Sequence, residues 1–207
     1  MMGTTITPHS NDPVDREGEA VDHQQNGIDV MIDDPLWADI IDDPQALVHM
    51  CHAEAVRKVP ALCGSAAILF ANDSTLQRLN ATFRGKDKPT NVLSFPSGLF
   101  SGPSSGSSFP SGPFGEPIAN FLGDIAIARE TCVREAAELN KPVRDHTAHL
   151  IVHGLLHLIG LDHQADAEAK EMETMEAIIL KHLGFAAPYD DNPDMGDSSK
   201  FGGADQT

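Results

Sequence analysis

The chain has 207 residues, of which 41% are hydrophobic, so it can form one domain with a buried core and is not globally disordered. It contains no apolar stretch near the roughly 18–20 residues of a membrane span, and its N-terminus lacks a signal-peptide pattern. We therefore expect a cytoplasmic protein with no membrane association. The formal net charge of −17 argues against a nucleic-acid partner, unless basic residues are concentrated locally.

The first elements alternate between strand and helix. Residues 1–27 are polar, acidic and without periodicity, so we predict a disordered leader. A short strand is expected at 28–32, and a helix begins near Pro44 with Asp42 or Asp43 as its N-cap. The apolar run 65–71 is typical of a buried strand.

A second helix is expected after this strand, with Asp73 or Ser74 as its N-cap and Gly85 at its end. Its predicted apolar face consists of Leu76, Leu79 and Phe83. The segment RLNATFRGKDK (78–88) carries four basic residues against one acid, namely Arg78, Arg84, Lys86 and Lys88 against Asp87. Such a strip can hold a polyanion although the whole chain is acidic, because the electrostatic field at the contact determines whether a polyanion binds. A solvated helix end is equally compatible with the charge pattern.

The second half continues with a strand at 90–95, ended by Pro96, and another strand at 122–128. Between them, 97–117 is rich in Gly, Ser and Pro and is predicted to be a long mobile loop. Helices are expected at 129–140, 143–159 and 166–183, before a disordered acidic tail at 185–207. The order of elements predicts an α+β fold, with helices packed on a mixed sheet in one domain at 28–184.

Five histidines occur within the predicted helix and the turn after it: His146, His149, His153, His157 and His163. Residues four apart share a helix face, so His153 and His157 can converge on one metal ion, as can His149 and His153. Gly160 lets the chain turn, which returns His163 to the face of His153 and His157. Three histidines and an open position are typical of a catalytic zinc site.

The remaining histidines and the cysteines have simpler interpretations. His146 and His149 are interpreted as core histidines with polar partners, together with His49, His52 and His182. The three cysteines are odd in number and form no CxxC motif, so we expect reduced core thiols: Cys51, Cys63 and Cys132.

The stretch HGLLHLIGLDH (153–163) has the histidine spacing of a zinc protease, but Gly154 stands where such a protease has its general-base glutamate. Peptide hydrolysis needs that base to carry a proton to the leaving amine. A phosphodiester asks for less, because a metal or solvent can help neutralise its alkoxide leaving group. Gly154 therefore favours phosphoryl over peptide chemistry.

This stretch, with LNATFRGKDKPTNVLSFP (79–96) and LGDIAIA (122–128), closely resembles the YbeY family of bacterial rRNA maturation factors over residues 28–184. The resemblance implies a zincin-like α+β fold and a single-strand-specific endoribonuclease that acts in 16S rRNA 3′-end maturation and ribosome quality control. It also implies one zinc ion per chain, held by His153, His157 and His163, with Arg84 as a functional residue beside it. Many members have aspartate at the position of Asn91, so no carboxylate role is carried over there.

The leading hypothesis is thus a zinc-dependent endoribonuclease that acts on single-stranded rRNA of the small ribosomal subunit. Arg84 is expected to stabilise the phosphoryl transition state, while Lys86 and Lys88 hold the RNA backbone. Asp162 is a candidate to orient a ligand histidine or accept a proton, or else only caps the turn. Two alternatives stay open: a zincin-type metalloprotease or amidase, and a ribosome assembly factor that uses its metal mainly for stability.

Overall fold

The computed structural model describes residues 27–98, 121–161 and 166–186. Its four strands are β1 (Ile28–Ile32), β2 (Ser65–Ala71), β3 (Val92–Pro96) and β4 (Phe121–Ala128). Its α-helices are α1 (Pro44–Lys58), α2 (Asp73–Arg84), α3 (Arg129–Glu138), α4 (Val143–Leu158) and α5 (Asp166–His182), with short 3-10 helices at Pro35–Asp39 and Pro60–Leu62. The α+β fold with a mixed sheet and the predicted order of elements are confirmed.

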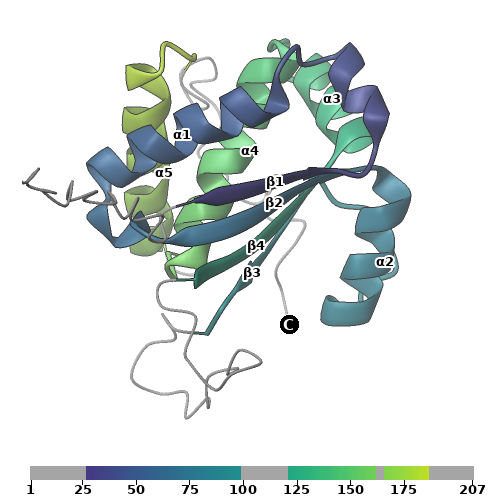
Figure 1. The fold of residues 1–207 in the computed structure, drawn as a ribbon, viewed down its shortest axis with the longest axis horizontal. Helices are drawn as coiled ribbons and strands as arrows, with labels where there is room; N and C mark the ends of the chain where they lie inside the picture. The colour runs from purple at the N-terminus through teal and green to yellow at the C-terminus, as the bar shows by residue number, and fades with distance from the viewer. Residues whose placement is uncertain (1–26, 99–120, 162–165, 187–207) are drawn as a thin grey trace, which may run out of the picture.

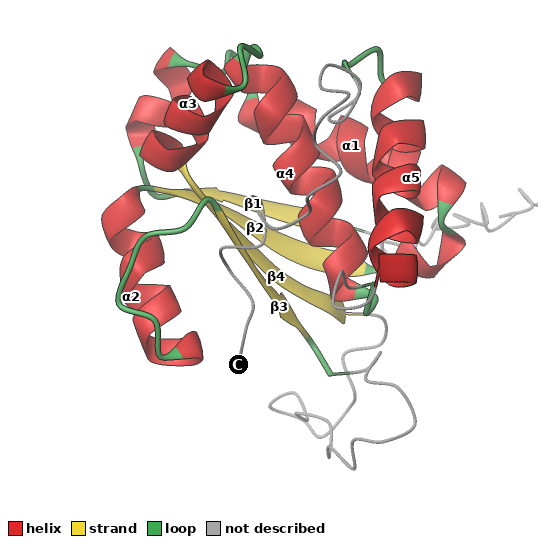
Figure 2. Cartoon of the chain, turned by 180° about the vertical axis from the view of Figure 1, so that it is seen from behind, coloured by secondary structure: helices red, strands yellow, loops and turns green. Residues whose placement is uncertain are grey.

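The sheet has the strand order β1-β2-β4-β3. The first three of these strands are parallel, and β3 runs antiparallel to β4 at one edge, with Ser94 opposite Ile125. Helices α1 and α4 cover one face, and α5 packs outside them; α2 lies on the opposite face (Figures 1 and 2). The edge strand β3 contacts α4 on one face of the sheet and α2 on the other.

The main core lies between the sheet and helices α1, α4 and α5, and a smaller core lies under α2. Strand β4 serves both, because successive side chains point to opposite faces: Ile125 and Ile127 enter the main core and Ala126 the smaller one. Helix α4 is buried nearly all round, as its apolar sequence predicted. Phe185, beyond the predicted domain end, is also part of the main core.

Several local predictions need correction. The N-cap of α2 is Asn72, which accepts from the backbone N–H of Thr75, whereas Asp73 accepts from the N–H of Thr131 on α3. Phe83 was expected on the apolar face of α2, but its side chain extends past the smaller core and is 65% exposed. The N-cap of α1 is Asp43, one of the two predicted candidates.

The histidines and cysteines assigned to the core divide into three groups, of which His149 alone is half-buried. His52, His146, Cys51 and Cys132 are buried. The assignment is wrong for the exposed residues His49, Cys63 and His182, the last of which contacts Glu54 at 3.3 Å. None of the described helices is long and apolar enough to cross a membrane. The predicted leader, loop and tail fall largely outside the described residues.

Candidate metal centre

Helix α4 carries four histidines along one face, at positions 146, 149, 153 and 157. Spacings of three and four residues keep side chains on one side of a helix. The ring centroids are 6.2 Å apart for His146 and His149, 6.1 Å for His149 and His153, and 4.5 Å for His153 and His157. The rings therefore form a continuous polar stripe along α4, whose other residues from Leu150 to Leu158 are apolar.

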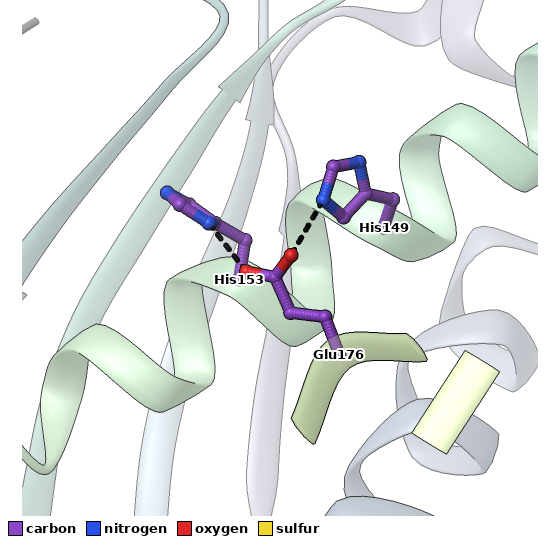
Figure 3. Close-up of side chains that lie close together, drawn as sticks. All are labelled: His149, His153 and Glu176. Carbon is purple, nitrogen blue, oxygen red and sulfur yellow. Dashed lines mark hydrogen bonds and ion pairs between the residues drawn. The ribbon is translucent and has the colours of Figure 1, made fainter. Parts of the chain in front are cut away.

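Glu176 of α5 binds two of these rings (Figure 3). Its carboxylate oxygens lie 2.9 Å from His149 Nε2 and 2.7 Å from His153 Nδ1, and its side chain is 1% exposed. Burial raises the pKa of Glu176, but the charges and hydrogen bonds of His149 and His153 outweigh it and hold the pKa well below its usual range. Glu176 is therefore a buried anion that fixes both rings. No motif in the sequence marks this glutamate among the others of α5.

The hydrogen bond to Glu176 leaves the other ring nitrogen of His153 pointing away from α5 (Figure 3). That nitrogen, Nε2, makes a hydrogen bond of 3.1 Å with Nε2 of His157. Two nitrogens that bind one zinc ion at about 2.1 Å with tetrahedral geometry are separated by about 3.4 Å. The pair is thus close to the spacing of two zinc ligands, and a carboxylate behind one ring is the usual support of a metal-binding histidine.

A second grouping overlaps with the first. Ligand atoms of His149, His153 and Glu176 all lie within 4.8 Å of one another, and this group could also hold a metal ion. In the structure Glu176 accepts hydrogen bonds from both rings, which accounts for the close approach without an ion, as the direct hydrogen bond does for His153 and His157. The two groupings share His153 but differ in His157 and His149, so variants of these two residues distinguish them.

Two of the predicted site residues, His163 and Asp162, fall outside the described residues. The described chain ends at Leu161 on this side and resumes at α5, so the third predicted zinc ligand has no assigned position. Their roles remain predictions from the sequence.

Arg84 is connected to this region through the edge strand. Its Nη2 donates to the backbone carbonyl of Ser94 on β3 at 3.1 Å, and Ser94 Oγ lies 3.4 Å from the carbonyl oxygen of Gly154. Gly154 follows His153 directly on α4. Two contacts across β3 thus relate Arg84, from the last turn of α2, to the helix that carries the histidines.

Gly154 has a packing reason to be glycine. A Cβ atom at this position would lie 3.0 Å from both Cδ1 and Cγ2 of Ile125, whose side chain is 1% exposed. Helix α4 therefore approaches β4 too closely for a larger side chain to fit without displacement. Position 154, where a zinc protease carries its general-base glutamate, therefore faces the sheet in this chain.

Lys86 and Lys88 follow α2 in a tight turn. Gly85 caps the helix in the left-handed conformation at φ 67°, which glycine adopts without steric cost. The buried Asn80 donates from Nδ2 to the carbonyl of Lys88 at 2.8 Å and holds the turn against the helix. The structure thus gathers Arg84, Lys86 and Lys88 at one helix end, where the helix dipole favours cations.

Residues 39–184 match the family model described as Endoribonuclease YbeY. A relative from Bradyrhizobium sp. strain BTAi1, named Endoribonuclease YbeY, is 46% identical over 165 residues, covering 79% of this chain and 92% of its own. A relative of the same name from Jannaschia sp. strain CCS1 is 42% identical, covering 78% and 99%. A solution structure from Thermotoga maritima covers 83% of this chain with 17% identity and a TM-score of 0.48.

Proposed function

Because the chain belongs to the endoribonuclease YbeY family, we propose that it is a zinc-dependent endoribonuclease that cleaves single-stranded rRNA of the small ribosomal subunit. The proposed role is 16S rRNA 3′-end maturation and ribosome quality control in the cytoplasm. The observation that carries the zinc-dependent part is the pair of facing Nε2 atoms on His153 and His157, with Glu176 behind His153. The relatives are named endoribonucleases, which agrees with an endoribonuclease activity of this chain.

The residues present fit a zinc ion. Imidazole nitrogens are good zinc ligands, and the 3.1 Å separation of the two Nε2 atoms is near that of a shared ion. We propose His153, His157 and His163 as the ligands of one ion per chain, with Glu176 as the residue that orients His153. When bound, zinc supplies a Lewis acid at the scissile phosphate.

Arg84 is proposed to hold the scissile phosphate and to stabilise the charge that develops on it. A guanidinium matches the oxygens of a phosphate, and its own contact with Ser94 limits its movement. Lys86 and Lys88 would contact neighbouring phosphates of the RNA backbone. Asp162 is proposed as the proton acceptor, because the position after His153 carries no carboxylate.

The protease alternative is weakened by the edge of the sheet. An extended peptide commonly binds by adding a strand to a free sheet edge. On β3 the N–H of Val92 is taken by the side chain of Asn91 at 2.7 Å, the carbonyl of Ser94 by Arg84, and Pro96 has no N–H. The edge nearest to α4 is therefore poorly suited to pair with a peptide.

The test is cleavage of a 5′-labelled single-stranded RNA by the zinc-loaded protein. His157→Ala removes a proposed ligand, and His49→Ala removes an exposed histidine of α1 as a matched control. The proposal predicts cleavage by the parent and by His49→Ala, and at least about 100-fold slower cleavage by His157→Ala. Equal cleavage by all three would indicate a contaminating nuclease and contradict the assignment. RNA binding without cleavage by the parent would favour the assembly-factor alternative.

A further inference from the structure

An exposed aromatic side chain lies beside the basic residues at the end of α2. Phe83 is 65% exposed, and its ring stands edge-on to that of Phe95 on β3, with centroids 5.2 Å apart and an interplanar angle of 65°. Phe95 is itself packed against the smaller core under α2. One edge contact thus supports the Phe83 ring while most of its surface remains in water.

The earlier apolar residues of α2 are covered by the smaller core, but Phe83 is not. Leu76, about two turns earlier, is fully buried under α2, and Leu79 is partly buried. Helix α2 continues past the smaller core, so its last apolar residue has no further layer to cover it. Single exposed apolar residues are common and by themselves carry no function. The surroundings of this one are what distinguish it.

Those surroundings are cationic in a chain of net charge −17. Arg84 adjoins Phe83 in the sequence and is tied to the edge of β3 by its hydrogen bond to Ser94. Lys86 and Lys88 follow in the turn that Asn80 holds. An aromatic ring among cations suits a ligand that combines negative charge with flat apolar rings, which is the chemistry of a single-stranded nucleic acid. A purely apolar protein partner would not select for these charges.

We propose that Phe83 is a stacking platform for one unpaired base of the RNA substrate, with the adjacent phosphate held by Arg84. This inference rests on the proposed function and adds a determinant of substrate choice to it. A base can stack on an exposed ring only when it has left its own helical stack, so Phe83 favours single-stranded over duplex RNA. The ring binds RNA and takes no part in the bond cleavage.

The experiment measures binding of a short, fluorescently labelled single-stranded RNA to the zinc-loaded protein by anisotropy on ice, with a gel to verify that the RNA stays intact. Phe83→Ala should weaken binding roughly 10-fold, and Phe83→Trp should bind at least as tightly as the parent. Phe83→Leu keeps an apolar side chain without a flat ring, so it should resemble Phe83→Ala. Leu36→Ala, at a side chain that is 49% exposed elsewhere, is the control and should not change binding.

Abasic substitutions in the RNA complete the test. One abasic position should weaken RNA binding to the parent but not RNA binding to Phe83→Ala, because the contact between the base and the ring is already lost when the ring is removed. Parent-like RNA binding by Phe83→Ala, with cleavage intact, would overturn the stacking proposal but not the proposed function. The exposed ring would then be assigned to a contact with a protein. If the parent binds no RNA, the proposed function fails and the stacking proposal fails with it. Thermal melting verifies that every variant is folded.

Discussion

Replacing Glu176 by glutamine perturbs the candidate metal centre with the least change of shape. The carboxylate is 1% exposed and accepts hydrogen bonds from His149 and His153 at 2.9 and 2.7 Å. A glutamine side chain keeps one acceptor oxygen but presents an NH₂ group in place of the other. If the NH₂ faces His153, Nδ1 of that ring must give up its proton, and the proton moves to Nε2. The proposed metal-binding nitrogen is then blocked.

The magnitude follows from these contacts. Loss of a carboxylate behind a ligand histidine lowers metal affinity by about 10- to 100-fold. Hydrogen bonds to a charged group contribute about 1.5–3 kcal/mol each, and glutamine retains one of the two at reduced strength while avoiding the cost of burying a charge. We therefore expect the metal-free Glu176→Gln protein to lose about 2 kcal/mol of unfolding free energy.

Two assays separate these effects. Zinc affinity is measured by competition with a chromophoric chelator, and unfolding free energy by urea titration in the presence of EDTA. Unchanged zinc affinity in Glu176→Gln would refute the role of Glu176 in orienting His153. If zinc binding were abolished altogether, and equally by His149→Ala, then Glu176 itself would be a ligand and the grouping of His149, His153 and Glu176 would hold the ion.

Three further predictions concern stability and reactivity. Gly154→Ala should cost about 1 kcal/mol of unfolding free energy, because the clash with Ile125 exceeds the gain in helix propensity; a more stable variant would contradict the packing argument. Burial raises the pKa of Asp34, but its hydrogen bond and charge pair with Arg129 outweigh burial and hold the pKa below its ordinary value. The pair therefore stabilises the fold above about pH 4 and loses this contribution as the pH falls further. Acidification should therefore lower the unfolding free energy of Asp34→Asn less than that of the parent. Equal pH profiles of the two proteins would rule this out. Under native conditions at about pH 8, a thiol reagent should modify Cys63 alone, because burial raises the pKa of the other two thiols to about 12, and fast reaction of a second thiol would count against that burial.

The elements were predictable because their signals are local. Hydrophobic periodicity and cap residues placed β1, β2 and the start of α1 at their observed residues. The same local logic could not choose among Asn72, Asp73 and Ser74 as the N-cap of α2, since all three side chains can accept the bond. The choice depends on α3, where the backbone of Thr131 occupies the carboxylate of Asp73.

The site was predicted less completely than the fold. The spacing of His153 and His157 on one helix face is a local property, and the structure places the two rings together. Glu176 was missed because α5 carries several glutamates, and only its packing against α4 shows which one is buried. The exposure of Phe83 has the same origin: periodicity assigns a helix face but not the point at which the neighbouring sheet ends.

The central claim is that His157 and His153 hold the metal, and the most direct test is metal content per chain. Parent, His157→Ala and His149→Ala are loaded with zinc, freed of excess by gel filtration and measured by plasma mass spectrometry. The account predicts about one ion per chain in the parent and in His149→Ala, and a small fraction of an ion in His157→Ala. Full zinc occupancy in His157→Ala, with loss in His149→Ala, would contradict the account and assign the metal to the group that contains Glu176.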